Sequence, residues 1–442
     1  MYKIKFIIIA LVCVSGLMFA GNSYSQTTRT ITLPEAVTLA KSNNSELTIA
    51  KLDEMKANEY VSEVYSENLF PSITLNSRYI RNVKKQVLNF AGQSVFLGTD
   101  NAITTSIDLQ EPIPVLGTPV FSGIQIAKYY SDLANKNTQA KEIKVASDVK
   151  KAYYGVLLSK EVITVNKNSL ENAQENFRVV EVRYKGGIAT EFDYLRAKVR
   201  VDNLLPAVSS SENNLLLSRK NLKNAIGTKT NEEYDATGSL LYDSTEVFGT
   251  TDQLLDRIAK ENIAIKQLNI NRLINDELVT VNKANYMPRL YGFASYGLAA
   301  NEDDGRKLGD YRFFNTFNLG LGLSWDLNFF KNDYKVQQSI IEIRKNDEQI
   351  SDTKSKLKLQ AQSVLIRIED ARNRIRSLYE TVKLSERGLE LADISFKGGI
   401  LNQIDVLDAN LQVSQSRLAY LQAIYDYLNA RTDLEQLLNR NN

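Results

Sequence analysis

The chain has 442 residues, with 54 Lys and Arg against 52 Asp and Glu, so its formal charge is only +2. This balance lacks the basic excess typical of nucleic-acid-binding proteins and argues against nucleic acid as a partner. The sequence has no His and one Cys, which removes the side chains of the commonest enzyme classes. We therefore predict no catalytic role, no cofactor and no metal site.

Residues 1–25 have the pattern of a cleaved signal peptide. Two lysines precede an apolar run over residues 6–20, and small residues permit cleavage before Gln26. The apolar run is shorter than the ~20 residues that a membrane-spanning helix needs. We predict an exported protein that loses its only cysteine, Cys13, with the leader.

The mature chain is predicted to open with one continuous helix, from Leu33 to about Asn68. Its start is indicated by a proline in the first turn, and its end by the Phe-Pro pair that follows. Two strands come next, because apolar residues alternate with polar ones over 73–79 and again over 103–110. The intervening residues 82–102 are predicted to be a polar loop.

Pro112 and Pro114 are expected to end the second strand, and a long helix follows it. No proline falls between Phe121 and Lys185. At about 1.5 Å per residue, an uninterrupted helix of this length spans roughly 100 Å. A shorter helix over residues 191–225 is expected to return along it.

The second half repeats this order of elements. We predict a helix over 252–287, strands over 290–299 and 317–327, a long helix over 331–397 and a return helix over 404–438. The same succession in both halves indicates an internal duplication.

A turn with two glycines marks the duplication, and its two copies lie 212 residues apart. A single Gly-Gly pair often caps a helix and carries little information by itself. The copies read Tyr184-Lys185-Gly186-Gly187 and Phe396-Lys397-Gly398-Gly399. The predicted divisions are the signal peptide 1–25, a first repeat 26–226, an inter-repeat segment 227–251 and a second repeat 252–442.

Apolar residues before both turns recur in alternating steps of four and three, the spacing of a coiled-coil seam. The second copy carries Leu357, Ala361, Val364, Ile368, Ala371, Ile375, Leu378, Val382, Leu389, Ala392 and Phe396, and the first carries Val145, Val149, Ala152, Val156, Ile163, Leu170, Ala173, Phe177, Val180 and Tyr184. The fold is therefore predicted to be mainly α, with long helices packed as coiled coils.

The clearest strand has a wholly apolar face and an opposite face of small or polar residues. The apolar face consists of Phe317, Leu319, Leu321, Leu323, Trp325 and Leu327. A half-buried sheet of a water-soluble protein gives such alternation, and so does a membrane strand between lipid and a watery lumen. The export signal, the aromatic residues near the strand end and the small or polar residues of the opposite face favour lipid as the partner of these side chains.

Four strands are too few to close a membrane barrel, because the smallest known have about eight and hydrocarbon tolerates no open edge. If the strands span a membrane, several chains must pool them. An oligomer with one shared β-barrel follows from the strand count.

The order of elements and the turn signature resemble the outer membrane efflux family, the TolC-like proteins. The signature is an aromatic residue, a glycine and then Asp-x-Leu-x-Ala. It consists of Tyr184, Gly187, Asp193, Leu195 and Ala197, and again of Phe396, Gly399, Asp405, Leu407 and Ala409. The resemblance covers essentially the whole mature chain.

This resemblance implies a homotrimer in the outer membrane of a Gram-negative cell, with four strands per chain in one trimeric β-barrel and a helical barrel that extends through the periplasm as a tunnel. It further implies a passive exit duct for a tripartite efflux or type I secretion system. The turns, with Tyr184, Gly186, Gly187, Asp193, Phe396, Gly398 and Gly399, would dock a periplasmic adaptor protein. That adaptor would connect to an inner-membrane pump of the RND, ABC or MFS type.

The family narrows its tunnel through acidic residues just after the second turn, which by position are Asp405 and Asp408. Their i, i+3 spacing places them on one helix face, so copies around a pore could form an acidic ring that favours cations. The alternative is that Asp405 caps the returning helix, with Asn402 as a rival cap. Some members latch the tip through a Tyr and an Arg of the second turn, where this chain has Phe396 and Leu401; Arg183 and Tyr184 of the first turn are possible substitutes.

A structural coiled-coil protein of the cell surface is the alternative to a channel. Such a stalk would share the heptad seam but would have no reason for pairs of alternating strands between its helices. The transported substrate cannot be read from this sequence.

Overall fold

The computed structural model describes residues 28–90, 92–116, 118–229, 232–246 and 248–440, and it is mainly helical. The predicted signal peptide lies outside the described residues. The chain divides into two compact units: unit 1 draws on residues 1–45, 145–247 and 364–434, and unit 2 on residues 46–144, 248–363 and 435–442. Both units combine segments from both halves of the sequence. The predicted repeats divide the sequence into consecutive stretches, whereas the units do not, so the repeat boundaries stay a prediction.

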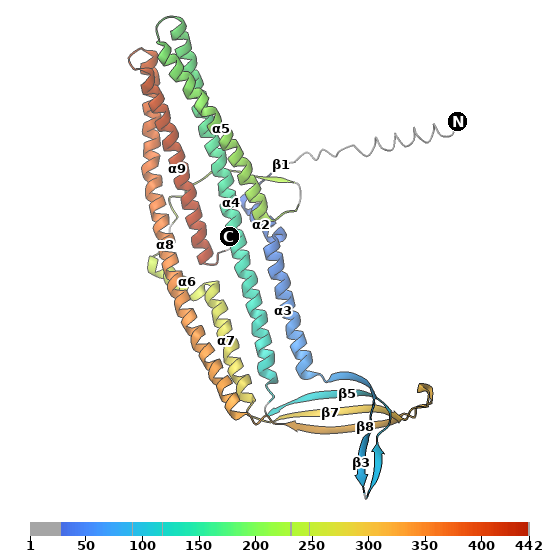
Figure 1. Ribbon diagram of the computed structural model, residues 1–442. Coiled ribbons are helices and arrows are strands. Elements are labelled where there is room, and N and C mark those ends of the chain that lie inside the picture. Colours follow the sequence, from blue (N-terminus) through green and yellow to red (C-terminus); the bar gives the residue numbers. More distant parts are fainter. Residues whose placement is uncertain (1–27, 91, 117, 230–231, 247, 441–442) are drawn as a thin grey trace, which may run out of the picture. The chain divides into compact units, whose positions relative to one another are not determined.

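Two helical hairpins dominate unit 1 (Figure 1). Helix α4 (Val120–Lys185) turns into α5 (Glu191–Ile226), and α8 (Phe329–Lys397) turns into α9 (Gln403–Leu437). Contacts join the two helices of each hairpin: Lys167 pairs with Glu212 across the first, and Arg417 with Glu386 across the second. The N-terminal portions of α4 and α8 belong to unit 2. The predicted pairs of long and returning helices are confirmed.

Unit 1 also contains a short helix and two short strands. Strand β1 (Thr28–Ile31) pairs in parallel with β6 (Glu233–Ala236), and α2 (Leu33–Asn43) follows β1. The buried hydroxyl of Tyr153 on α4 donates to the carbonyl oxygens of Ile31 and Thr237, at 3.1 and 2.6 Å. The inter-repeat segment is thereby fixed to the hairpin helices of the same unit.

The coiled-coil seam is buried as predicted. None of the predicted seam residues from 357 to 396 is exposed, and of those from 145 to 184 Tyr184, next to the turn, is the exception. Ala361, Val364 and Ala371 on α8 have no accessible surface, nor do Val149 and Val156 on α4. Burial of such residues is the main favourable term in helix packing. The alternating steps of four and three therefore correctly identified the packed faces.

Each half of the chain has a helix break that the periodicity did not predict. The predicted first helix is in fact α2 and α3 (Ser45–Leu69), and the helix predicted over 252–287 is α6 (Thr251–Glu261) and α7 (Ile263–Ala284). Asn44 and Asn262 stand at the breaks with extended backbone. Asn262 caps α7 by accepting from the Ala264 N–H at 3.0 Å, and it donates to the Leu437 carbonyl at 2.9 Å. A local cap and a distant acceptor together outweigh continuation of the helix.

A four-stranded antiparallel sheet lies in unit 2, in the order β2-β5-β7-β8 (Figure 1). These strands are β2 (Ser72–Arg81), β5 (Asn101–Leu116), β7 (Arg289–Glu302) and β8 (Phe314–Ser324). The edge strands β2 and β8 each have one neighbour among the described residues. The sheet is therefore open on both sides within one chain.

The register of the sheet separates apolar from polar side chains. Paired residues share a face, so one face carries Ile73, Leu75, Ile107, Leu109, Tyr296, Phe317, Leu319, Leu321 and Leu323. On the other face the Asp108 carboxylate accepts hydrogen bonds from Asn76, Ser106 and Ser295, at 2.9, 2.8 and 2.5 Å. On β8 the apolar side chains are 60–76% exposed. One face is thus apolar and uncovered, whereas the other holds the hydrogen-bonded cluster around Asp108 together with the rings of Tyr291 and Phe293.

Three expectations about the strands were wrong. The predicted polar loop contains a hairpin of β3 (Gln86–Phe90) and β4 (Gln93–Leu97), and β5 continues past Pro112 and Pro114 to Leu116. The register of β5 shifts between Pro112 and Leu116, and such an irregularity accommodates residues that lack an N–H. Strand β8 ends at Ser324, so Trp325 and Leu327 follow the strand instead of continuing its apolar face.

Among the described residues, no helix combines the length and the apolar character that crossing a membrane requires.

Candidate functional site

The two glycine turns have the same backbone geometry. Gly187 has a φ of +74° and Gly399 a φ of +77°, the left-handed region in which glycine carries no steric penalty. The Ile188 N–H donates to the Arg183 carbonyl at 2.8 Å, and the Ile400 N–H to the Ser395 carbonyl at 2.8 Å. These bonds satisfy carbonyl groups at the helix C-termini. The turns predicted from sequence are structural equivalents.

An aspartate closes the start of each returning helix. The Asp193 carboxylate accepts from the Thr190 N–H at 3.3 Å while the Thr190 hydroxyl accepts from the Asp193 N–H at 3.2 Å, which is a capping box. The Asp405 carboxylate accepts from the Asn402 N–H at 3.0 Å. Helix α9 begins directly after Asn402. Asn402, the rival candidate, therefore stands at the cap position, and Asp405 in the first turn accepts from the backbone N–H of Asn402, which is one half of a capping box.

A small apolar cluster joins the ends of the two hairpins within unit 1. It consists of Val180, Ala197, Ala392, Phe396 and Val406, all buried. Tyr184 stacks on Tyr194 with ring centroids 5.1 Å apart, and Tyr194 packs against the cluster. Phe396 and Tyr184 occupy equivalent turn positions, but Phe396 is buried and Tyr184 is exposed.

Arg183 connects the first turn to the second. Its guanidinium donates to the Phe396 carbonyl at 3.0 Å and lies 4.4 Å from the centroid of the Phe396 ring. This combines a charge-assisted hydrogen bond with a cation–π contact. Arg183 thus joins the two turns of one chain. From the sequence it was named only as a possible substitute for the latch residues of the second turn.

Two isoleucines project from the turns. Ile188 is 80% exposed and Ile400 is 81% exposed, although each follows a pair of glycines in an otherwise packed region. The two turns thus each expose one large apolar side chain at the equivalent position. Sequence reasoning did not single them out.

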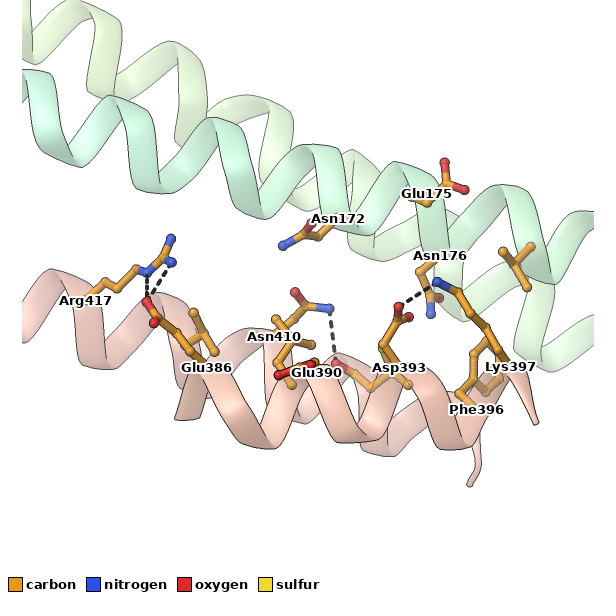
Figure 2. Close-up of a pocket in the computed structure, with 14 residues that line it drawn as sticks. Asn172, Glu175, Asn176, Glu386, Glu390, Asp393, Phe396, Lys397, Asn410 and Arg417 are labelled. Carbon is orange, nitrogen blue, oxygen red and sulfur yellow. Dashed lines mark hydrogen bonds and ion pairs between the residues drawn. The ribbon is translucent and has the colours of Figure 1, made fainter. Parts of the chain in front are cut away.

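A groove of about 370 Å³ lies between the hairpins, next to the turns (Figure 2). Acidic side chains of α4 and α8 line it, together with two bases: Glu175, Glu386, Glu390, Asp393, Lys397 and Arg417. Arg417 pairs with Glu386 at 2.6 Å, and Lys397 with Asp393 at 2.7 Å. The hydrogen bond and charge of Asp393 raise the pKa of Lys397. Two of the four acids are therefore paired within the groove, whereas Glu175 and Glu390 pair with Arg178 and Arg387 outside its lining.

Polar residues also line the contact between the two hairpins. Ser169 and Ser414 share a hydrogen bond at 2.5 Å, and the Gln403 amide donates to Asn176 at 3.3 Å. Both Asn176 and Gln403 are buried. Sequence reasoning missed this contact because the periodicity of one helix does not say which face meets another hairpin.

The two candidate pore residues are both exposed near the start of α9. Asp405 and Asp408 each carry a carboxylate there, whereas the first copy has Asp193 and then Arg196 at the equivalent places. The second turn therefore has two acids where the first has an acid and a base. An acidic ring made from several copies remains a prediction.

Comparison with known proteins places this arrangement in a family. The sequence profile of the family described as outer membrane efflux protein matches residues 36–228 and 254–440. The chain belongs to the outer membrane efflux protein family. Members of this family are transport channels, so the protein is an outer membrane efflux channel and not an enzyme, as predicted.

Relatives of this efflux protein are distant in sequence. Outer membrane protein TolC of Escherichia coli is 20% identical over 433 residues, which are 96% of this chain and 85% of TolC. TolC of Salmonella enteritidis is 19% identical over 419 residues, covering 93% of this chain and 82% of TolC.

Solved structures share the fold. The CmeC outer membrane channel of Campylobacter jejuni has a TM-score of 0.75 at 17% identity, covering 95% of this chain and 90% of CmeC. The open state of the MtrE outer membrane channel of Neisseria gonorrhoeae has a TM-score of 0.74 at 15% identity, covering 92% and 89%. The predicted fold class, mainly α with a few strands, is confirmed.

Proposed function

We propose that three copies of this efflux protein form one channel, which serves as the passive exit duct of a tripartite efflux or type I secretion system. In this proposal the four strands of each chain join one β-barrel in the outer membrane, and the helical hairpins form the tunnel on the periplasmic side. The exposed face with Phe317, Leu319, Leu321 and Leu323 meets lipid, and the face with Asp108 meets the lumen.

One observation carries this proposal: the sheet is open at both edges, apolar on one face, and on the other it holds the hydrogen-bonded polar cluster around Asp108. Unpaired edge groups cost several kcal/mol each in hydrocarbon. Because β2 and β8 run antiparallel in a sheet of four strands, β8 of one copy meets β2 of the next with the correct polarity. Pooled sheets therefore close without reversing any strand.

The glycine turns are proposed to dock a periplasmic adaptor, which connects to an inner-membrane pump. Their support is the pair of exposed residues Ile188 and Ile400 beside left-handed glycines. Asp405 and Asp408 are proposed to contribute an acidic ring to the pore. The hydrogen bond from the Asn402 N–H is compatible with a ring, since it uses one carboxylate oxygen of Asp405 and the residue is exposed.

Conductance in planar lipid bilayers tests the channel. The purified oligomer is expected to give discrete conductance steps with a preference for cations. In a salt gradient, Asp405→Asn with Asp408→Asn should move the reversal potential toward zero, because each copy loses two negative charges. Asn keeps an oxygen that accepts from the Asn402 N–H.

Asp193→Asn is the matched control, since Asp193 caps the first returning helix in the way that Asp405 caps the second. Its reversal potential should stay at the wild-type value. Absence of conductance steps would favour the alternative, a coiled-coil surface stalk without a pore. Steps with an unchanged reversal potential in the double variant would remove the acidic ring but leave the channel.

A further inference from the structure

The hairpin of β3 and β4 is an arm whose apolar side chains have no cover in the single chain. The arm, whose described residues are 83–90 and 92–99, lies between β2 and β5 in the chain and projects from the sheet (Figure 1). Its exposed apolar residues are Val83, Val87, Leu88, Phe96 and Leu97. Phe96 is 68% exposed and Val83 is 93% exposed. A cluster of exposed apolar side chains of this kind is unusual for a loop in water and indicates a contact with another surface.

The base of the arm is firmly held. Asn82 donates its N–H to the Asp100 carbonyl and its amide to the Thr99 carbonyl, both at 2.8 Å. Lys85 pairs with Asp100 at 3.2 Å and with Asp303 at 2.5 Å. Its hydrogen bond to Asp303 lowers the pKa of that carboxyl group. The arm therefore leaves the sheet in a defined direction.

The two strands of the arm are not expected to be stable by themselves. An isolated two-stranded hairpin is marginal in water. The register pairs Val87 with Phe96 on one face, while Leu88 lies on the opposite face, and all three are exposed. Apolar residues on both faces of a bare hairpin imply that a further surface packs against it.

The direction of the strands decides which surface lies within reach. Strand β2 runs toward the arm, and β8 starts at the same end of the sheet, because Asn101 at the start of β5 pairs with Arg81 of β2 and with Glu302 of β7. If β8 of one copy pairs with β2 of another, the arm of the second copy lies next to the β7–β8 loop of the first. That loop, residues 303–313, exposes Leu308 and Phe313, of which Leu308 is 67% exposed.

We propose that the arm packs against the β7–β8 loop of a neighbouring copy of this chain and forms a subunit contact at the end of the sheet remote from the helices. The proposal rests on the pooled sheet described above. Phe96 and Leu308 are the central residues of this contact. The arm then buries its apolar face on a surface that every copy provides.

Cysteine cross-linking between two differently tagged copies tests the contact, because the predicted mature chain contains no cysteine. Phe96→Cys in one copy and Leu308→Cys in the other are co-expressed, and outer membranes are treated with a short bis-maleimide. A cross-linked heterodimer that carries both tags is expected. Met287→Cys replaces Leu308→Cys as the control, since Met287 is also exposed but precedes β7 at the opposite end of the sheet. This control pair should give no heterodimer.

The mass of the detergent-purified oligomer is measured for every variant, so that the two proposals fail separately. A trimer without the heterodimer between positions 96 and 308 overturns the arm contact and leaves the channel in place. A chain that remains monomeric overturns the proposed channel and the arm contact with it. Labelling of position 96 by a photoreactive lipid in place of the heterodimer also overturns the contact.

Discussion

Gly227 and Gly399 have the same backbone conformation in different surroundings. Both have a φ of +77°, but a Cβ added to Gly227 would lie 2.7 Å from Asn44 Cα, whereas one added to Gly399 would meet no atom within 4 Å. Gly227 ends α5, and Asn44 donates its amide to the Ala225 carbonyl at 3.0 Å. The helix end and the Asn44 break therefore touch backbone to backbone, which only glycine permits.

Alanine at these two positions should separate the two effects. Gly399→Ala should cost about 1–2 kcal/mol of unfolding free energy, because a side chain disfavours the left-handed region. Gly227→Ala should cost about 1–3 kcal/mol more, because the added carbon overlaps backbone that cannot rotate away. Denaturant unfolding in detergent, followed by helical circular dichroism, measures both. Equal losses in the two variants would contradict the close approach at Gly227.

At the scale of the element, each glycine turn ends a long helix and presents one exposed isoleucine. The turn satisfies its own carbonyl groups, and the neighbouring cluster with Phe396 and Val406 holds it in place. Ile188 and Ile400 contribute little to this packing because most of their surface is exposed. Their side chains are therefore free to contact another protein.

Photo-cross-linking in the native host tests docking at the turns. A benzophenone amino acid at position 188 or 400 is expected to capture one periplasmic protein with a predicted coiled-coil hairpin, identified by mass spectrometry. The same amino acid at Leu384, which is 73% exposed on α8 but distant from the turn, should not capture it. Ile400→Glu should weaken capture from position 188 severalfold, because a charge would be buried in the contact. Capture of the same protein from all three positions would argue against docking at the turns.

At the scale of the whole molecule, the proposed membrane-embedded oligomer gives the two faces of the sheet different surroundings. In one chain the two faces of β8 are similarly accessible, since Asn318 and Leu319 are both exposed. The membrane would make them different, with Leu319 in lipid and Asn318 toward the lumen. Identical substitutions at adjacent positions therefore report which face meets lipid.

Leu319→Arg should reduce the yield of assembled oligomer in the outer membrane, since a lipid-facing Arg costs ~2–4 kcal/mol near the bilayer midplane. Asn318→Arg should assemble at nearly the wild-type level, because a lumen tolerates charge. Yield is measured by gel mobility of unheated outer membrane samples. If both variants assemble equally well, or if Asn318→Arg is the more damaging, the assigned lipid face is wrong.

Periodicity in the sequence determined the long helices, their buried seam, the pleated strands and the two equivalent turns. Each of these depends on residues a few positions apart, so the signal is local. The hydrogen bond between Asp405 and the Asn402 N–H at the start of α9 was also predictable, because the two residues are three positions apart.

The tertiary structure decided the features that depend on distant partners. The break at Asn262 is fixed by the Leu437 carbonyl, and the joining of the turns by Arg183 on Phe396. The arm was not predicted because its strands are short and follow charged residues, a pattern that is typical of a loop. The ion pair between Lys85 and the distant Asp303, which holds the base of the arm, is visible only in the folded chain. Local pattern specifies which side chains must be buried, whereas only the folded chain specifies what lies across from them.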